Sequence, residues 1–432
     1  MTKFAARLFA GAAALCLASA AAASAPVDIS EAVRLTLKDN SALRSLRQEL
    51  MKAQAFKLQA DGTLLPSVSA GGVLNIQREP QTSDGSDRSD SRAANASLEQ
   101  VIYSGGKNSA QRAQSPQVRT IAEMAVADGE NSAVGELYAR FYDVLLKKKQ
   151  IEAEAAAVAT SELHLKQVTQ MAKLGLANKL EVIRAGQQLA TNTANLSTAR
   201  GLHETSTISL MNYMAIAPQE RRDVTGELYE PAISGDRRES LMLAEKFRAD
   251  RRQLEERLRY QENQIKIARS GMLPKVTAGL SSGWSDPYRQ QDRGSDAWRA
   301  EISLSIPIFD RNVTRSSVMT AKAVREQDKI ALEQKELDIK SEVEAAWSEI
   351  ETSRRSLRAS EKALELAKES LRLAEVGYRE GVTPQLDLLD AQSSLTLAQL
   401  EYNRAQYNHL IAVVALKVTE GTIIQWNGEK RR

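Results

Sequence analysis

The sequence is built from two similar halves, and this duplication limits the possible folds more than any other feature. Leu64-Leu65-Pro66 reappears as Met272-Leu273-Pro274, and Leu180-Glu181-Val182 reappears as Leu386-Asp387-Leu388. The offset between the halves stays at 206 to 208 residues. So constant an offset predicts the same order of elements in each half: helix, strand, strand, very long helix, sharp turn, helix.

Four strands are predicted from period-two alternation, at about 67–77, 93–103, 275–285 and 297–309. The alternation is cleanest in the last, where Trp298, Ile302 and Ile306 share one parity. It is weakest in the second, because Gln100 lies on the apolar parity. The two strands of each pair are separated by a polar loop. The pattern indicates a sheet with one apolar and one polar face.

The length of these strands, about ten residues, is what a tilted strand needs to cross a bilayer. A half-buried sheet in a soluble protein would explain the strands alone equally well. Four strands cannot close a barrel, because the smallest membrane barrels use about 8 strands. If the strands span a membrane, several copies of the chain must contribute to one barrel.

Two very long helices are predicted, at 104–173 and at 311–379, and Pro116 is the single proline within them. At 1.5 Å per residue each is roughly 105 Å long. Pairs of shorter helices add up to nearly the same length, 29–65 with 178–213 and 237–273 with 385–418. Helices of this length are typical of coiled coils and tunnels, and the matched lengths predict a wall of uniform height.

The first residues predict export. Lys3 and Arg7 precede an apolar, alanine-rich stretch, the layout of a secretory signal peptide at 1–23. Cleavage after Ala23 is favoured over cleavage after Ala25, because Pro26 would follow the second cut directly. An uncleaved anchor is the alternative, although the stretch is shorter than the ~20 residues of a spanning helix. Cys16, the single cysteine, lies inside this segment, so the mature chain is expected to have no disulfide.

Composition disfavours several classes of function. The net charge of +3 is spread along the chain, which argues against nucleic-acid binding. Aromatic residues make up 5% and charged residues 26%, which favours long helices over a large compact core. His164, His203 and His409 lack metal-ligand spacing and are interpreted as surface residues. With no phosphate loop or nucleophile elbow, we expect no enzyme, no catalytic residue, no metal and no cofactor.

The duplicated strand pairs between long helices, behind a signal peptide, resemble the TolC-like outer membrane efflux protein family. The most specific part is the turn between long and short helix, read at 174–182 and again at 380–388. In both, a glycine reverses the chain and an acidic residue follows. The resemblance implies a mainly α protein with a transmembrane β part. It also implies a trimeric 12-stranded outer membrane β-barrel continued by a periplasmic α-helical coiled-coil barrel.

The resemblance also implies a domain organisation. After the signal peptide, a first efflux-protein repeat occupies 24–216 and a second occupies 237–418. An inter-repeat linker at 217–236 and a C-terminal tail at 419–432 are expected around the middle of the tunnel.

Two groups of site residues follow from the resemblance. The turns would contact a periplasmic adaptor protein at Gly175, Leu176, Gly381 and Val382. The periplasmic gate would consist of Asp387, Asp390, Tyr378 and Glu181.

Within that gate, the spacing of three puts both aspartates on one helix face. In the implied trimer, the pairs from three chains would form a ring of six carboxylates. Rings of carboxylates select for cations. The first half does not repeat the pair, because Arg184 stands where Asp390 does. A solvated pair without a special role is the alternative. Tyr378 and Glu181 resemble the hydrogen-bonded pair that holds the gate closed, whereas Thr383 stands where the prototype has an arginine lock.

The implied function is a passive exit duct of a tripartite efflux or type I secretion system. Its expected partners are two further copies of the chain, a periplasmic adaptor, an inner membrane transporter and outer membrane lipid. The expected location is the outer membrane, with a long periplasmic extension. The alternative is a periplasmic structural coiled coil without channel activity. The sequence does not indicate whether drugs, metals or proteins are exported.

Overall fold

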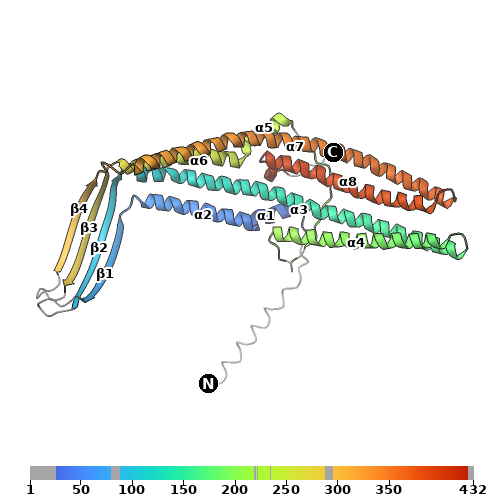
Figure 1. Ribbon diagram of the computed structural model, residues 1–432, viewed down its shortest axis with the longest axis horizontal. Coiled ribbons are helices and arrows are strands. Elements are labelled where there is room, and N and C mark those ends of the chain that lie inside the picture. The colour runs from blue at the N-terminus through green and yellow to red at the C-terminus, as the bar shows by residue number, and fades with distance from the viewer. Residues whose placement is uncertain are drawn as a thin grey trace, which may run out of the picture. The chain divides into compact units, whose positions relative to one another are not determined.

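The computed structural model describes residues 26–78, 88–217, 220, 222–233, 235–287 and 295–426. Figure 1 shows its elements, which are, in chain order, α1 (Ile29–Asp39), α2 (Ser41–Gly62), β1 (Ser67–Arg78), β2 (Arg88–Ser104), α3 (Lys107–Lys173), α4 (Lys179–Tyr213), α5 (Arg237–Phe247), α6 (Ala249–Arg269), η2 (Ser270–Met272), β3 (Lys275–Pro287), β4 (Ser295–Ser305), α7 (Val313–Arg379), α8 (Gln385–Thr419) and η3 (Ile423–Gln425). The predicted signal peptide, 1–23, lies outside the described residues.

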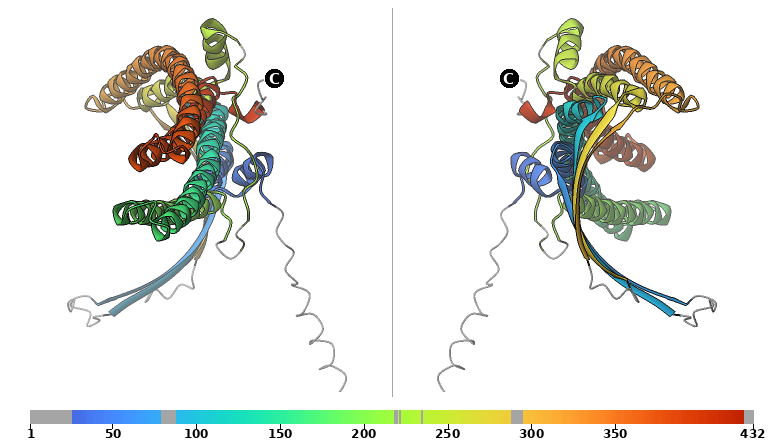
Figure 2. Two further views of the ribbon diagram at one scale, coloured as in Figure 1. Left: turned by 90° about the vertical axis from the view of Figure 1, so that its right-hand side faces the viewer. Right: turned by 90° about the vertical axis from the view of Figure 1, so that its left-hand side faces the viewer.

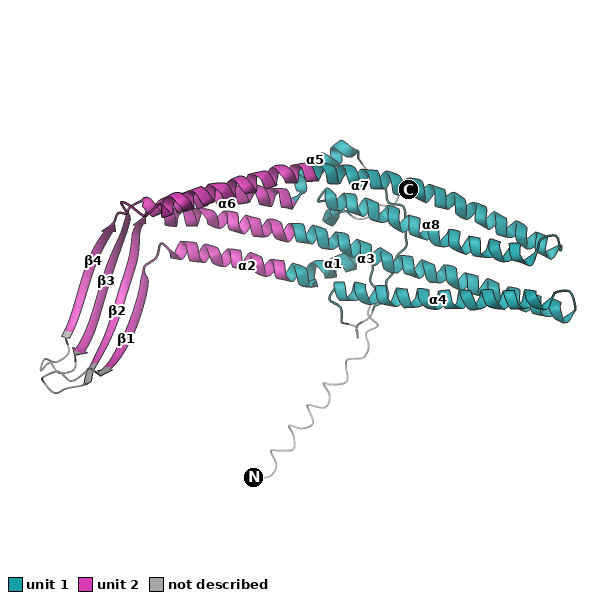
Figure 3. Ribbon diagram, viewed as in Figure 1, with its two compact units in different colours: residues 1–44, 128–248, 339–432 teal, residues 45–127, 249–338 magenta. Residues whose placement is uncertain are grey.

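The chain divides into two compact units, coloured separately in Figure 3. Unit 1 comprises residues 1–44, 128–248 and 339–432, and unit 2 comprises 45–127 and 249–338. Each unit takes equivalent segments from both halves of the sequence. Each half of the sequence therefore contributes one copy of the repeated segments to each unit.

Unit 2 contains a four-stranded antiparallel sheet in the order β1-β2-β3-β4, whose strands bow along their length (Figure 2). The four strands lie where alternation predicts them, but β2 begins at Arg88 rather than near 93. β4 ends at Ser305, short of the predicted 309. A register shift between Val101 and Tyr103 interrupts the pairing of β2 with β3. Gln100 lies before this bulge and pairs in regular register with Ala278, so the bulge changes the parity only beyond Val101.

The pairing register gives the sheet two different faces. Val68 lies opposite Leu98, which lies opposite Leu280, so apolar side chains line up across the strands. Ser69, Ser97 and Ser281 line up in the same way on the other face. The apolar face is exposed in the single chain, with Trp298 at 77% and Ile302 at 80% exposure. Gln100, on the apolar parity, uses its amide to donate to the Leu64 carbonyl oxygen at 3.1 Å.

The long helices α3 and α7 are each 67 residues, and Pro116 lies within α3. Both begin slightly later than predicted, because two residues with positive φ precede each. In the first half these are Gly105 and Gly106. In the second half Arg311 and Asn312 adopt the same region, with φ of 55° and 66°. The second half therefore holds an arginine in a conformation that costs about 1–2 kcal/mol for a residue with a Cβ.

The continuous helices predicted at 29–65 and 237–273 are wrong, because each is broken in two. Asn40 ends α1, and its side chain accepts hydrogen bonds from the backbone N–H groups of Ala42 and Leu43 at the start of α2. The same amide donates to the Tyr213 carbonyl oxygen at the end of α4, at 3.0 Å. Arg248 interrupts the second helix at the equivalent place and forms an ion pair with Glu342 of α7.

The largest buried core lies in unit 1, around the middle of α3. Phe141 and Leu137 are its centre, and their neighbours come from α4 and α8. The predicted linker and tail contribute to it. Val27 and Val224 form a parallel β-bridge, and Ile423 of η3 is buried in the same cluster. Residues 218, 219, 221 and 234 of the linker and 427–432 of the tail lie outside the described part of the chain.

No helix in the described ranges combines the length and the apolar character that a membrane span needs.

Candidate functional site

The candidate site consists of the two turns that join α3 to α4 and α7 to α8, both in unit 1 (Figure 1). The turns have nearly the same backbone. Gly175 has φ of 76° and Gly381 has φ of 73°, the left-handed region that ends a helix. The next residue closes each turn, since the N–H of Leu176 donates to the Met171 carbonyl and that of Val382 to the Gly377 carbonyl, at 2.9 and 2.8 Å.

The helices that follow the turns begin differently. Asn178 caps α4, because its Oδ1 accepts from the Glu181 N–H at 2.9 Å while its Nδ2 donates to Glu181 Oε1 at 2.9 Å. Pro384 begins α8 and makes no side-chain cap. The second turn is also tighter, because a side chain at Gly377 would collide with Thr383. Thr383, which stands in the place of the expected arginine lock, is thus packed against the end of α7.

The acidic pair lies on the exposed side of α8. Asp387 and Asp390 are both exposed, whereas Leu388 and Leu389 between them are buried. A spacing of three places both carboxylates on one face of the helix. Among the described residues neither carboxylate forms an ion pair within 4 Å. Their charges are therefore presented outward by a helix whose opposite side is anchored.

Tyr378 and Glu181 do not form the expected hydrogen bond with each other in this chain. The Tyr378 hydroxyl is buried and has no hydrogen-bond partner among the described residues. The Glu181 carboxylate is instead bonded to its own cap, Asn178. The two side chains are nevertheless near each other, since the Glu181 charge contributes, after burial, to raising the pKa of Tyr378.

A buried cluster joins the two turns. Gln385, the first residue of α8, is 5% exposed and its Nε2 donates to the Glu181 carbonyl oxygen at 2.9 Å. The same nitrogen lies 3.3 Å from Nε2 of His164, on α3. The His164 ring in turn packs edge-on against Tyr378, with 5.6 Å between ring centroids. Four elements, α3, α4, α7 and α8, therefore meet through side chains that lie far apart in the sequence.

Burial favours the neutral form of His164. Its side chain is 4% exposed, and this desolvation lowers its pKa, although the nearby Glu181 charge acts in the opposite direction. A neutral ring can accept the Gln385 amide hydrogen at Nε2, and a protonated ring cannot. The interpretation of His164 and His409 as surface residues is wrong, because both are buried. The sequence carries no local signal for this, since burial arises from a neighbouring hairpin.

The four residues expected to contact an adaptor lie at the tips of the turns. Gly175 and Gly381 are exposed, and Leu176 and Val382 are 71% and 80% exposed. Exposed leucines at 174 and 180 extend the apolar surface of the first turn. Each turn therefore presents an apolar tip around its glycine.

Comparison with known proteins assigns the chain to a protein family. The family model described as outer membrane efflux protein matches residues 32–215 and 242–422. The chain belongs to the outer membrane efflux protein family. The two matched segments follow the duplication, and they favour a channel over the structural coiled coil. The family consists of channel proteins rather than enzymes.

Relatives and solved structures agree with this assignment. The efflux protein is 23% identical over 406 residues to the pyoverdine export outer membrane protein OpmQ of Pseudomonas putida, covering 91% of this chain and 86% of that one. It is 23% identical over 397 residues to the outer membrane protein TolC of Escherichia coli, covering 84% and 76%. Its fold matches the CmeC outer membrane channel of Campylobacter jejuni with a TM-score of 0.77 at 16% identity, over 91% and 86% of the chains.

These matches confirm the predicted fold class, mainly α with a transmembrane β part, and the outer membrane location. The efflux protein is an outer membrane channel with a periplasmic helical extension.

Proposed function

We propose that three copies of the efflux protein form one exit duct, each giving four strands to a 12-stranded barrel. The observation that carries the proposal is the open sheet. Within the described residues β1 and β4 each have a neighbour on one side only, and the apolar face is exposed. Open edges and a bare apolar face are costly unless further strands close the sheet and lipid covers the face.

The repeats of the duct are proposed at 24–216 and 237–418, joined by the linker at 217–236, with the tail at 419–432. A signal peptide at 1–23 would direct the chain to the periplasm for assembly. Substrates would enter from an inner membrane transporter and a periplasmic adaptor. The chain itself supplies no energy in this scheme, so its part in transport is that of a passive conduit.

The acidic pair is proposed as the selectivity ring at the periplasmic entrance. In a trimer Asp387 and Asp390 would bring six carboxylates near one axis. Their outward placement on α8 and the absence of an ion pair in the described chain support this role. Rings of carboxylates attract cations and resist anions. Glu181 and Tyr378 are proposed as part of the closed gate, acting through the cluster around Gln385 rather than through a bond to each other.

The apolar tips at Gly175, Leu176, Gly381 and Val382 are proposed as the adaptor contact. Substituting Leu176 or Val382 with aspartate should weaken cross-linking to the adaptor in cells. The conductance of the purified channel should stay unchanged. A variant that cross-links normally would contradict the contact.

Single-channel recording in a planar lipid bilayer tests the duct and its ring. The wild type should give small, cation-selective openings that multivalent cations block. The double variant Asp387→Asn/Asp390→Asn should lose both selectivity and block. Glu401→Gln, which removes an exposed charge about three turns further along α8, is the control and should behave as wild type.

The possible outcomes separate the two parts of the proposal. Openings with unchanged selectivity in the double variant would keep the duct and remove the ring. A well-folded, detergent-stable preparation that never conducts would overturn the duct itself.

A further inference from the structure

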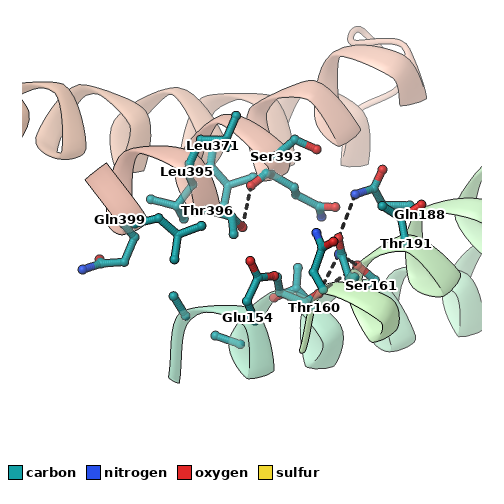
Figure 4. A pocket seen from close by; sticks show the side chains of 18 of the residues that line it. Glu154, Thr160, Ser161, Gln188, Thr191, Leu371, Ser393, Leu395, Thr396 and Gln399 are labelled. Atoms are coloured by element: carbon teal, nitrogen blue, oxygen red, sulfur yellow. Dashed lines mark hydrogen bonds between the residues drawn. The ribbon is translucent and has the colours of Figure 1, made fainter. Parts of the chain in front are cut away.

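A cavity of about 440 Å³ lies in unit 1 between the α3–α4 hairpin and the α7–α8 hairpin (Figure 4). All four helices contribute to its lining. Its size falls in the range of small-molecule pockets, roughly 300–1,000 Å³. It is separate from the cluster around His164, because none of the gate residues lines it.

One carboxyl group in this cavity is not satisfied by the protein. Glu154, on α3, is 8% exposed, and its side chain points into the space between the hairpins in Figure 4. Its Oε2 has no hydrogen-bond partner in the described chain. Burial raises the pKa of this carboxyl. The other charged lining residue, Lys368 of α7, is exposed and, among the described residues, forms no ion pair with Glu154 within 4 Å.

A second buried oxygen in the same cavity is also without a donor. Oε1 of Gln392, on α8, has no partner among the described residues. Two amides of α4 are already occupied, since Asn192 Nδ2 donates to Ser161 Oγ at 2.6 Å and Gln188 Nε2 donates to Asn192 Oδ1 at 3.0 Å. In the described lining, no buried side-chain donor lacks an acceptor. What the cavity lacks is therefore a donor.

The remaining wall is apolar. Alanines of α3 and leucines of α7 and α8 line it: Ala153, Ala156, Ala157, Leu371, Leu395 and Leu400. A bare metal ion does not match such a wall, and the described residues contain no group of three or more metal-ligating side chains. The two acceptors without a donor and the apolar wall together fit a charged nitrogen attached to an apolar body.

We propose that this cavity binds a protonated primary amine with a compact apolar body, its ammonium group between Glu154 and Gln392. The ammonium supplies N–H donors to both oxygens and a positive charge to the carboxylate, a charge-assisted pairing. The apolar body fills the space between the alanines and leucines. The site does not depend on the proposed duct, and its occupant would bridge all four helices of the two hairpins.

Isothermal titration of the purified full-length protein in detergent tests the site, with 1-naphthylmethylamine as the probe. The matched neutral compound, 1-naphthylmethanol, keeps the apolar body and lacks the charge. The amine should bind at one site per chain, at least about tenfold more tightly than the alcohol, because hydrogen bonds to charged groups are worth more than neutral ones.

Three variants locate the binding. Glu154→Gln should weaken binding of the amine by about tenfold or more and leave the affinity for the alcohol unchanged. Ala157→Leu, which fills the cavity, should abolish binding of both compounds. Glu162→Gln removes an exposed carboxylate of the same helix and should have no effect. Equal affinity of the amine in wild type and Glu154→Gln, or no binding to the folded wild type, would overturn the proposal.

Discussion

The two turns of unit 1 share a backbone and differ in what their side chains do. In the first turn Asn178 and Glu181 form two hydrogen bonds with each other, so these polar groups find their partners within the turn. In the second turn Pro384 provides no cap, and Gln385 reaches across to the first turn instead. Arg184 follows the first turn where Asp390 follows the second.

This difference shows how a duplicated motif can divide its tasks. The first copy forms its cap within the turn, and its Glu181 carbonyl oxygen and buried His164 ring contact the second copy. The second copy supplies the donor that joins the hairpins, and it also carries the exposed carboxylates. The contact that joins the turns is therefore made by residues that differ between the copies, since Gln385 stands where the first copy has Lys179.

The largest effect is expected from exchanging charge between the copies. Asp390→Arg gives the second copy the residue of the first and should abolish cation selectivity. It should also weaken block by multivalent cations on the order of a hundredfold, because the charge reverses in every subunit. Arg184→Asp is the matched exchange and should change block little. Single-channel recording measures both, and equal effects would contradict the special role of the second copy.

Breaking the contact between the copies should have the next largest effect. Gln385→Leu removes the donor to the Glu181 carbonyl and to His164, and should raise the frequency of spontaneous opening about tenfold. Lys179, the equivalent position of the first copy, is exposed, so Lys179→Leu should leave gating unchanged. An unchanged opening frequency in Gln385→Leu would show that this contact does not hold the gate.

Acid should loosen the contact around His164. Burial lowers the pKa of His164, so the unfolded chain takes up a proton first. The stability that the neutral ring contributes is therefore present above about pH 6.5 and is lost as the pH falls below it. Protection factors of the amide hydrogens near the turns, which are corrected for the slower intrinsic exchange in acid, should fall between pH 7.5 and pH 5 in the wild type and fall less in His164→Gln. His203→Gln serves as control, and an identical pH response in His164→Gln would remove this assignment.

The smallest effect is expected from the helix caps. Asn178→Ala should destabilise the first turn of α4 by about 1 kcal/mol, because the Glu181 N–H loses its acceptor. Pro384→Ala removes no side-chain cap and should change the start of α8 much less. Hydrogen exchange of the two helix starts compares them within each variant. A larger change at α8 would mean that the proline does more than begin the helix.

The elements of the fold were predictable because their signals are local. Alternation along each strand places an apolar and a polar face without reference to any partner, and the register confirms both. The turn glycines, Gly175 and Gly381, have the positive φ that their position after a long helix predicts. The helix breaks at Asn40 and Arg248 were missed, because Asn40 is held by Tyr213 and Arg248 by Glu342, both distant in sequence.

The candidate site was predictable only in part. The spacing of Asp387 and Asp390 placed them on one helix face, and the exposed tips follow from the turns themselves. Gln385 and His164 are separated by 221 residues, and no local sequence pattern predicts that they contact each other.

The sequence by itself therefore determined the duplicated order of elements, the two-faced strands and the positions of the turns. These depend on periodicity and on single-residue backbone preferences. Only the tertiary structure decided which polar side chains are buried and whether they find partners. That depends on how two hairpins pack, and it separates the satisfied amides of Asn192 and Gln188 from the unsatisfied carboxyl of Glu154.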